Sequence, residues 1–210
     1  MAKVFKKGLI ATLSIVLFLV FYPIKLARYF YEKVFLGNSR TSIGMVAVFA
    51  ETFCSVQEAV KILLPDAQSV KEETKILTDG QKQSISKAAE VVFDPTLDKE
   101  YHVYIAESNG RLIGYAMEDT VKGKWGNIHY MMGFSADGKI TDVVVLELQE
   151  RRGRPVKERK FLDQFVGKTT QEPIRLKKDI KGVGGATISS TGMTNGIRKM
   201  AFIFNELYKK

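Results

Sequence analysis

Two pairs of strand-like segments, each joined by a tight-turn dipeptide, constrain the fold of this chain more than any other feature. The segments are 101–107 with 111–118, and 128–134 with 140–148. The turns fall at Asn109-Gly110 and Asp137-Gly138. Asn-Gly and Asp-Gly accept the positive φ angles that hairpin turns require. The pattern predicts an antiparallel meander of about four strands.

Helical periodicity is expected on both sides of these strands. The segments predicted as helical are 51–64, 81–92, 161–165 and 191–208. In the last of them, apolar residues recur at spacings of 4, 3, 4 and 3 and make one apolar stripe. Residues 66–80 are polar and are expected to be irregular. Helices flanking an antiparallel sheet make an α+β domain, which is the fold class that we predict.

An uncharged apolar run near the N-terminus, residues 8–24, predicts one transmembrane helix ahead of this domain. A helix of that length spans about 25 Å, slightly less than a bilayer core. A cleaved signal peptide is the alternative, but Lys25 and Arg28 follow at once and no A-x-A-like site is present. We therefore expect a membrane anchor and juxtamembrane segment in residues 1–36 and a folded domain in residues 37–210.

The net charge of +9 does not indicate nucleic acid. Residues 1–36 hold six basic residues and one acidic residue, so more than half of the surplus flanks the apolar run. That distribution is typical of a membrane boundary, and no RNP, KH or zinc-finger pattern is present. A single cysteine, Cys54, excludes an internal disulfide framework and a CxxC site.

A loop of small residues precedes the last predicted helix and is the candidate site for chemistry. Residues 182–191 read GVGGATISST. A helix N-terminus offers free backbone N–H groups and the positive end of the helix dipole, both of which favour a phosphate. Ser189, Ser190 or Thr191 would cap the helix. An ordinary glycine-rich turn with a cap is the alternative interpretation.

The segment GGATISS resembles the SGAT(I/V)(T/S)S signature of the FMN-binding domain family. This family includes the G subunit of the Rnf electron-transport complex and the C subunit of the sodium-translocating NADH:quinone reductase. The resemblance implies that Thr187 carries FMN through a phosphoester bond, installed by a flavin transferase that uses FAD and Mg²⁺. It also implies a cofactor site built from the neighbours of that residue, with Trp125 as a ring contact: Gly184, Gly185, Ala186, Ile188, Ser189 and Ser190.

The resemblance covers most of residues 8–208. It includes Leu63-Leu64-Pro65, the segment MMGFSADGKITDVVVLEL and the segment from Phe161 to Lys168. Gly184 stands where the family usually has Ser or Thr, and Lys181 stands where it commonly has an acidic residue. The chain therefore resembles a divergent branch of the family.

The resemblance implies a membrane-anchored flavoprotein that relays electrons within a membrane redox complex, rather than a complete enzyme. Its expected partners are the other subunits of that complex, the flavin transferase, the lipid bilayer and the quinone pool. The soluble domain is expected on the extracytoplasmic side of a bacterial or archaeal cytoplasmic membrane. Two alternatives remain open: a flavin-free structural or assembly subunit, and a stand-alone extracytoplasmic flavin reductase.

Overall fold

The computed structural model describes residues 51–149 and 153–209. The predicted anchor, residues 1–36, and the predicted domain boundary at residue 37 lie outside these ranges. Within the described ranges, none of the helices has both the length and the apolar character needed to cross a bilayer.

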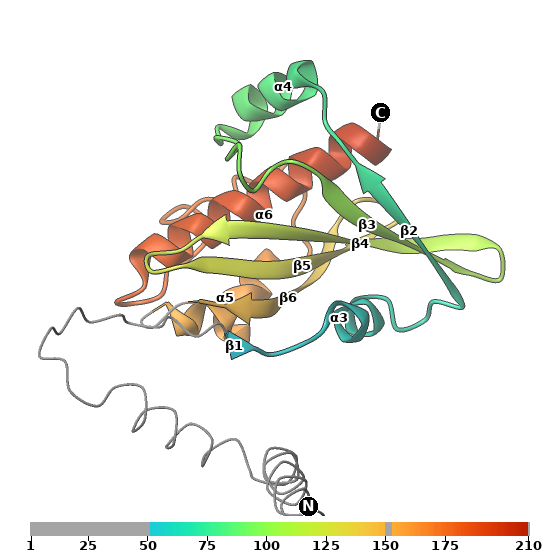
Figure 1. The fold of residues 1–210 in the computed structure, drawn as a ribbon, viewed down its shortest axis with the longest axis horizontal. Helices are drawn as coiled ribbons and strands as arrows, with labels where there is room; N and C mark the ends of the chain where they lie inside the picture. The colour runs from blue at the N-terminus through green and yellow to red at the C-terminus, as the bar shows by residue number, and fades with distance from the viewer. Residues whose placement is uncertain (1–50, 150–152, 210) are drawn as a thin grey trace, which may run out of the picture. The chain divides into compact units, whose positions relative to one another are not determined.

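Six antiparallel strands form one sheet with the order β1-β6-β5-β4-β3-β2 (Figure 1). The strands are β1 Glu51–Thr52, β2 Ser69–Lys75, β3 Tyr101–Ser108, β4 Arg111–Lys122, β5 Asn127–Ser135 and β6 Ile140–Leu148. The α+β prediction is confirmed, and the four strands of the expected meander are all present. The first turn is confirmed too, because Asn109 and Gly110 both have positive φ, at 51° and 70°.

The expectation of irregular structure in residues 66–80 was wrong. Strand β2 pairs with β3 along its whole length, from Ser69 opposite Glu107 to Lys75 opposite Tyr101. Most of its side chains are exposed or partly exposed, so it shows no apolar alternation. Backbone pairing at the edge of a sheet does not need an apolar face, and the residue pattern therefore carries no strand signal there. Residues 79 and 80 belong to the next helix.

The described helices are α3 Val56–Leu63, α4 Asp79–Ala89, α5 Arg159–Leu162 and α6 Thr187–Tyr208, with 3-10 turns η1 Arg154–Lys157 and η2 Asp163–Phe165. Helix α3 begins later than predicted because Glu51 and Thr52 pair with β6 and Ser55 caps the helix. The Ser55 hydroxyl accepts a hydrogen bond from the Glu58 N–H at 3.2 Å. Helix α6 begins four residues earlier than predicted.

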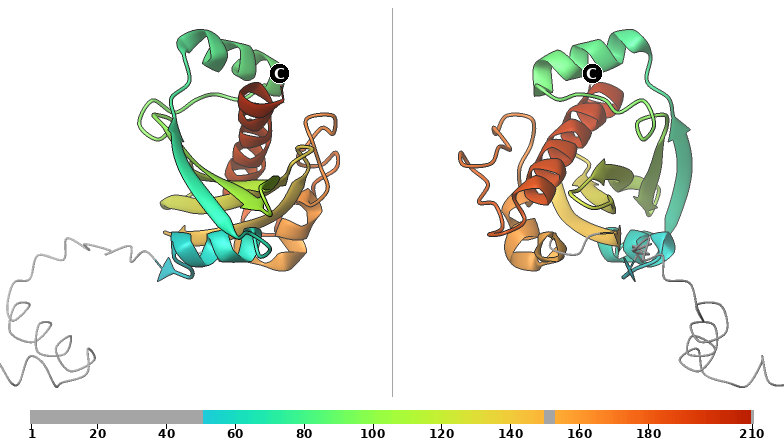
Figure 2. Two further views of the ribbon diagram at one scale, coloured as in Figure 1. Left: turned by 90° about the vertical axis from the view of Figure 1, so that its right-hand side faces the viewer. Right: turned by 60° about the vertical axis from the view of Figure 1, so that its left-hand side comes forward.

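The sheet has an apolar core on each face. One face packs against α4, α5 and α6, and the other face packs against α3. Strand β5 shows the alternation, because Tyr130 and Met132 belong to the first core and Met131 to the second. Figure 2 shows the sheet curling around α6. Within the first core, the rings of Phe134 and Phe204 stack with centroids 4.4 Å apart.

Two glycines let α6 lie directly against β4. A Cβ on Gly192 would lie 2.5 Å from the carbonyl oxygen of Lys122. A Cβ on Gly196 would lie 2.7 Å from the Tyr130 hydroxyl and would also overlap Val121. No carbon can occupy either position without movement of a neighbour. The closeness of α6 to β4 therefore depends on the absence of side chains at these two positions.

We expect Gly196→Ala to lower the free energy of unfolding by about 2 kcal/mol, because overpacking a tight interface costs about 1–3 kcal/mol. The matched control is Gly80→Ala in α4, where an added Cβ meets nothing within 4 Å. That control should be neutral or stabilising by up to about 1 kcal/mol, because alanine favours a helix over glycine. Urea unfolding of both variants measures the difference. Equal stabilities would contradict the close packing of α6 on β4.

Candidate functional site

The glycine-rich loop turns sharply into α6. Gly185 has a φ of +75°, which an L side chain rarely adopts, and Ala186 stands at the N-cap position without a side-chain hydrogen bond. The capping prediction was wrong for all three candidates. The Ser190 hydroxyl accepts a hydrogen bond from the Val183 N–H at 3.1 Å, and the Thr191 hydroxyl donates one to the Thr187 carbonyl at 2.8 Å. Ser189 lies inside the helix and is buried.

The predicted acceptor residue is exposed at the first residue of α6. Thr187 and Gly184 are exposed, and an added Cβ on Gly184 would meet nothing within 4 Å. Ile188 is 53% exposed. Ser189 and Ser190, by contrast, are 1% and 0% exposed and face the protein interior. The structure therefore divides the predicted site into an accessible part and a part that holds the loop in place.

The end of the helix suits a phosphate group. Helix α6 has 22 residues, its first turn carries no acidic side chain, and no side chain caps it. The first N–H groups of a helix have no partner within the helix, and the dipole places positive potential on them. A phosphoester on Thr187 would lie at this end of the helix. The residues present thus fit a phosphate-bearing cofactor such as FMN.

Two side chains that sequence analysis did not single out hold the backbone ahead of the loop. The Gln164 side chain accepts a hydrogen bond from the Lys181 N–H at 2.7 Å and donates one to the Lys181 carbonyl at 3.1 Å. The Asp179 carboxylate accepts from the N–H groups of Ile174 and Arg175 at 3.1 and 2.7 Å. The spacing of residues along the sequence does not reveal such tertiary contacts. Gln164 does, however, belong to the FLDQF segment, which is part of the family resemblance.

A pocket of about 440 Å³ lies on one side of the loop. The loop residues 182–184 line one wall, and Phe161 with Pro155 contributes apolar surface. Lys160 and Lys181 line it as well, together with one acidic residue, Glu158. Small-molecule sites typically measure about 300–1,000 Å³ and combine apolar walls with a few polar groups. The volume of this pocket falls within that range.

Trp125 lies in the connection between β4 and β5 and is 54% exposed. The ammonium group of Lys124 lies 5.2 Å from the centre of its ring. The end of β4 contacts α6 at Gly192, which is between one and two helical turns beyond Thr187. The structure thus brings the Trp125 turn to the N-terminal part of α6.

A buried group of charges fixes α6 to the rest of the domain. Lys199 on α6 forms ion pairs with Asp98 and with Asp119, the latter at 3.2 Å. The Tyr101 hydroxyl donates a hydrogen bond to Asp98 at 3.0 Å, and the Tyr130 hydroxyl donates one to Asp119 at 2.7 Å. All three charged side chains are at most 6% exposed.

The charges of this group influence one another. Burial raises the pKa of Asp119, and this effect outweighs the opposing influence of Lys199 and of the Tyr130 hydroxyl. Burial alone would lower the pKa of Lys199, but the attraction of Asp119 and Asp98 raises it above its usual value. Lys199 therefore remains charged at neutral pH and stabilises two buried carboxylates.

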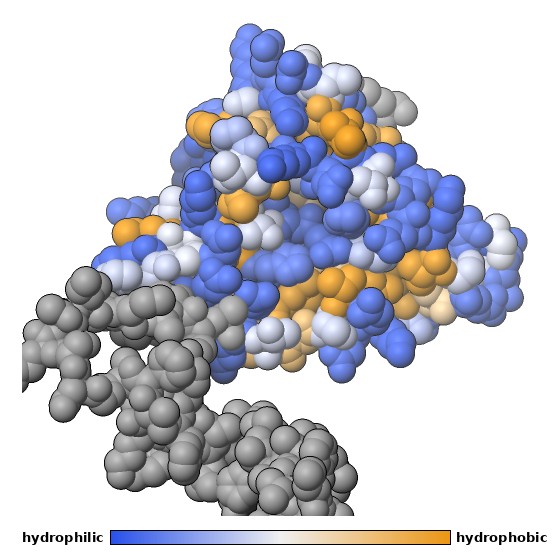
Figure 3. All heavy atoms as spheres, viewed as in Figure 1, coloured by the Kyte–Doolittle hydropathy of each residue, from blue (hydrophilic) through white to orange (hydrophobic). Residues whose placement is uncertain are grey.

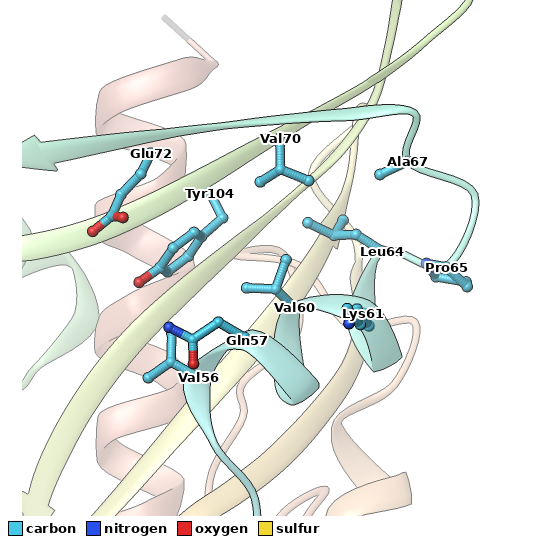
Figure 4. Close-up of a pocket in the computed structure, with 10 residues that line it drawn as sticks. All are labelled: Val56, Gln57, Val60, Lys61, Leu64, Pro65, Ala67, Val70, Glu72 and Tyr104. Carbon is cyan, nitrogen blue, oxygen red and sulfur yellow. The ribbon is translucent and has the colours of Figure 1, made fainter.

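A second pocket, on the face of the sheet covered by α3, has a different character (Figure 4). It measures about 470 Å³ and is lined mainly by aliphatic residues of α3 and of the segment that follows: Val56, Val60, Leu64, Pro65, Ala67 and Val70. In Figure 3, hydrophobic residues are exposed over the region of α3, and other hydrophobic patches lie beside α4 and at the left of the view. The described residues contain no group of three or more His, Cys, Asp or Glu side chains placed to bind a metal ion.

A comparison with known protein families gives a match that covers both the Trp125 turn and the glycine-rich loop. Residues 123–201 match the model of the FMN-binding domain family. This match confirms the resemblance indicated by the GGATISS segment. The matched region includes β5, β6, the loop and most of α6, while β1 to β4 precede it.

Two curated relatives are similar to this chain. The first is the G subunit of a Na⁺-translocating ferredoxin:NAD⁺ oxidoreductase complex of Acetobacterium woodii, 31% identical over 117 residues, which cover 51% of this chain and 56% of the relative. The second is the G subunit of a proton-translocating ferredoxin:NAD⁺ oxidoreductase complex of Clostridium ljungdahlii, 28% identical over 103 residues, 46% of this chain and 56% of the relative. The chain thus spans a little over half the length of each relative.

Two solved structures also show similarity. NqrC of Shewanella oneidensis is 16% identical, with a TM-score of 0.45, and the alignment covers 68% of this chain and 86% of that one. The C subunit of the Na⁺-translocating NADH-quinone reductase of Parabacteroides distasonis is 18% identical, with a TM-score of 0.47 and coverages of 69% and 79%.

In the segment that matches the FMN-binding domain family, burial limits which side chains a flavin ring can contact. Trp125, the predicted ring contact, is 54% exposed, whereas Tyr130 and Met132 of β5 are 0% exposed. Because the two buried side chains belong to the core between the sheet and α6, a bound ring cannot reach them unless the core opens. Trp125 is therefore the accessible side chain among these three.

We expect Lys199→Met to lower the free energy of unfolding by about 3–5 kcal/mol at neutral pH, because it leaves buried carboxylates without their cation. The loss should be smaller at pH 5. The folded-state pKa of Asp119 is already raised, so the folded state binds this proton more tightly than the unfolded state. The stabilising contribution of protonated Asp119 is therefore lost as pH rises through its folded-state pKa. Removing Lys199 makes this loss larger, because it takes away the cation that favours the charged carboxylate.

Urea unfolding at both pH values measures this difference. The control is Lys87→Met, on the exposed side of α4. An exposed substitution of this kind should change stability by less than about 0.5 kcal/mol at either pH. A loss for Lys199→Met that is the same at pH 5 and at neutral pH would show that Lys199 does not neutralise these carboxylates.

Proposed function

We propose that this chain is an electron-carrying flavoprotein subunit that holds FMN covalently through a phosphoester bond to Thr187. The observation that carries the proposal is the position of Thr187. It is exposed at the first residue of a long, uncapped helix, inside a segment that matches the FMN-binding domain family. A transferase can reach this hydroxyl, and the helix end then offsets the negative charge of the phosphate.

The residues around Thr187 support a division of roles. Gly184 and Gly185 leave the hydroxyl accessible, and Ser190 holds the loop by its bond to the Val183 N–H. The pocket beside the loop receives the flavin ring in this proposal. Trp125, the ring contact that the resemblance implies, does not line this pocket. Bound flavin supplies the redox chemistry by taking up and releasing electrons, and the chain positions it and adjusts its surroundings.

Two lysines, Lys160 and Lys181, and one acidic residue, Glu158, line this pocket and give it a surplus of one positive charge. A cation beside a flavin favours its reduced, more negatively charged forms, because opposite charges attract more strongly where water is partly excluded. The two lysines thus favour electron uptake by a ring in this pocket.

The curated relatives are named as subunits of ferredoxin:NAD⁺ oxidoreductase complexes. By analogy, we propose that this chain works within a membrane electron-transfer complex, with other subunits or the quinone pool as redox partners. A flavin transferase completes its maturation.

Intact mass of the denatured protein tests the covalent bond. The full chain, co-expressed with an active flavin transferase, should gain the mass of FMN less one water. Thr187→Ala should gain nothing, and Thr187→Ser, which keeps a hydroxyl at the same place, should retain at least part of the modification. The alanine variant should still fold, because Thr187 is exposed. A change at an exposed residue usually alters stability by less than about 0.5 kcal/mol.

Unmodified wild-type protein, obtained while the transferase modifies a control substrate, would contradict the proposal. The chain would then be better explained as a flavin-free structural subunit, consistent with its unusual Gly184 and Lys181. If the Thr187→Ala variant were still modified, the flavin would be attached to a residue other than Thr187.

We also propose that residues 8–24 anchor the chain in the membrane, with residues 37–210 as an extracytoplasmic domain. The uncharged run and the flanking basic residues support this arrangement. The full chain should remain in the membrane fraction after carbonate extraction, and protease added to spheroplasts should degrade the domain. Release by carbonate would contradict the anchor, and protection in intact spheroplasts would contradict the orientation.

A further inference from the structure

The charges of the described domain are divided between two parts of the chain. Residues 51–149, which form the sheet with α3 and α4, hold sixteen acidic and ten basic residues, a surplus of six negative charges. Residues 153–186, which lead into the glycine-rich loop, hold nine basic and four acidic residues, a surplus of five positive charges. The loop that precedes Thr187 is therefore part of a basic region attached to an acidic one.

Several bases of this region are used within the domain. Arg154, Arg159, Lys168 and Arg175 form ion pairs, and Lys157 lies 3.6 Å from the centre of the Phe53 ring. The remaining four lysines are exposed and form no ion pair with any residue in the described ranges: Lys160, Lys177, Lys178 and Lys181. We call these four residues the basic rim.

The backbone that carries the basic rim is well fixed. Lys181 is held by the paired hydrogen bonds to Gln164. The Lys177 N–H donates to the Ile180 carbonyl at 2.9 Å, and Ile180 is 1% exposed. Ile174, at the other end of this turn, is 0% exposed. The lysines of the turn therefore project from a defined backbone into solvent.

Two members of the basic rim border the concave surface beside the loop. Lys160 and Lys181 line the same pocket as residues 182–184, and Lys177 and Lys178 lie within four residues of Lys181 along the chain. Because the proposed function gives this pocket to the flavin ring, a protein partner would meet Lys160 and Lys181 beside the ring rather than enter the pocket.

We propose that the basic rim is the docking surface for an acidic protein that exchanges electrons with this domain. This inference rests on the proposed function for the electron exchange, but the surface itself does not depend on a bound flavin. Exposed charge pairs contribute little to affinity and act mainly on the rate and orientation of encounter.

Association with a plant-type ferredoxin, a small acidic electron carrier, tests the proposal. The full chain is held in nanodiscs of neutral lipid, and its association rate with oxidised ferredoxin is measured at low and at high ionic strength. The rim variant replaces all four lysines: Lys160→Gln, Lys177→Gln, Lys178→Gln and Lys181→Gln. The control variant removes four exposed bases from the acidic part: Lys61→Gln, Lys87→Gln, Lys99→Gln and Arg111→Gln.

We expect the rim variant to associate about tenfold more slowly at low ionic strength, since electrostatic steering accelerates association by about 10–10³-fold. The difference should shrink at high ionic strength, where salt screens exposed charges. The control variant, with the same total charge, should stay within about twofold of wild type. Equal slowing of both variants would show that only net charge matters and would overturn the proposal, as would the absence of measurable association by wild type.

Two further comparisons decide what the surface binds and whether it depends on the flavin. If the rim variant loses binding to vesicles of phosphatidylglycerol while its ferredoxin association is unchanged, the surface binds lipid and the proposal is overturned. The same association is measured in Thr187→Ala, where normal association supports a surface that is independent of the flavin. Normal association by a wild-type chain that never acquires FMN would leave the docking surface standing and would refute the proposed function. If the wild-type chain acquires FMN but does not associate with ferredoxin, the proposed function stands and the docking surface is refuted.

Discussion

The direct packing of α6 on β4 is the contact on which the rest of the domain depends. Gly192 and Gly196 let the helix approach the strand, and Lys199, one turn beyond Gly196, is held by Asp98 and Asp119. A helix fixed at this depth has its first residue, Thr187, at a fixed place relative to the β4–β5 connection. The loop, the neighbouring pocket and the Trp125 turn therefore share one geometry, which the middle of α6 determines.

Local signals predicted much of this structure. The two turn dipeptides located both hairpins, and the apolar stripe located α6, because hairpin twist and helix periodicity are properties of neighbouring residues. Strand β2 was missed because its pairing partner, β3, comes 26 or more residues later and its own side chains mostly face solvent. The role of Ser190 as a support for the loop, rather than a cap, was also not predictable. It depends on where α6 begins, which is set by the packing of the helix on the sheet.

The candidate site likewise combines features that the local sequence predicts with features that it does not predict. The residue types at 184–187 indicated a phosphate-bearing cofactor, and the family match agrees with them. The features that would hold the site in shape come from distant residues: Gln164 on the Lys181 backbone, Asp179 on the preceding turn, and the buried Lys199 group. A motif identifies the residues that meet a ligand, whereas the contacts that support the motif are spread over the sequence and become visible only in the fold.

The two edges of the sheet have a consequence for how this domain meets other proteins. In the part of the chain that the structure describes, strand β1 comprises two residues, and β2, on the opposite edge, carries Lys71, Glu72, Glu73 and Lys75 among its seven. A short edge and a charged edge both discourage a further strand from joining a sheet. Neighbouring proteins therefore have little opportunity to extend this sheet by backbone pairing, and side chains are left to discriminate among them. Such a domain can be surrounded by other polypeptides without its edge strands pairing with theirs.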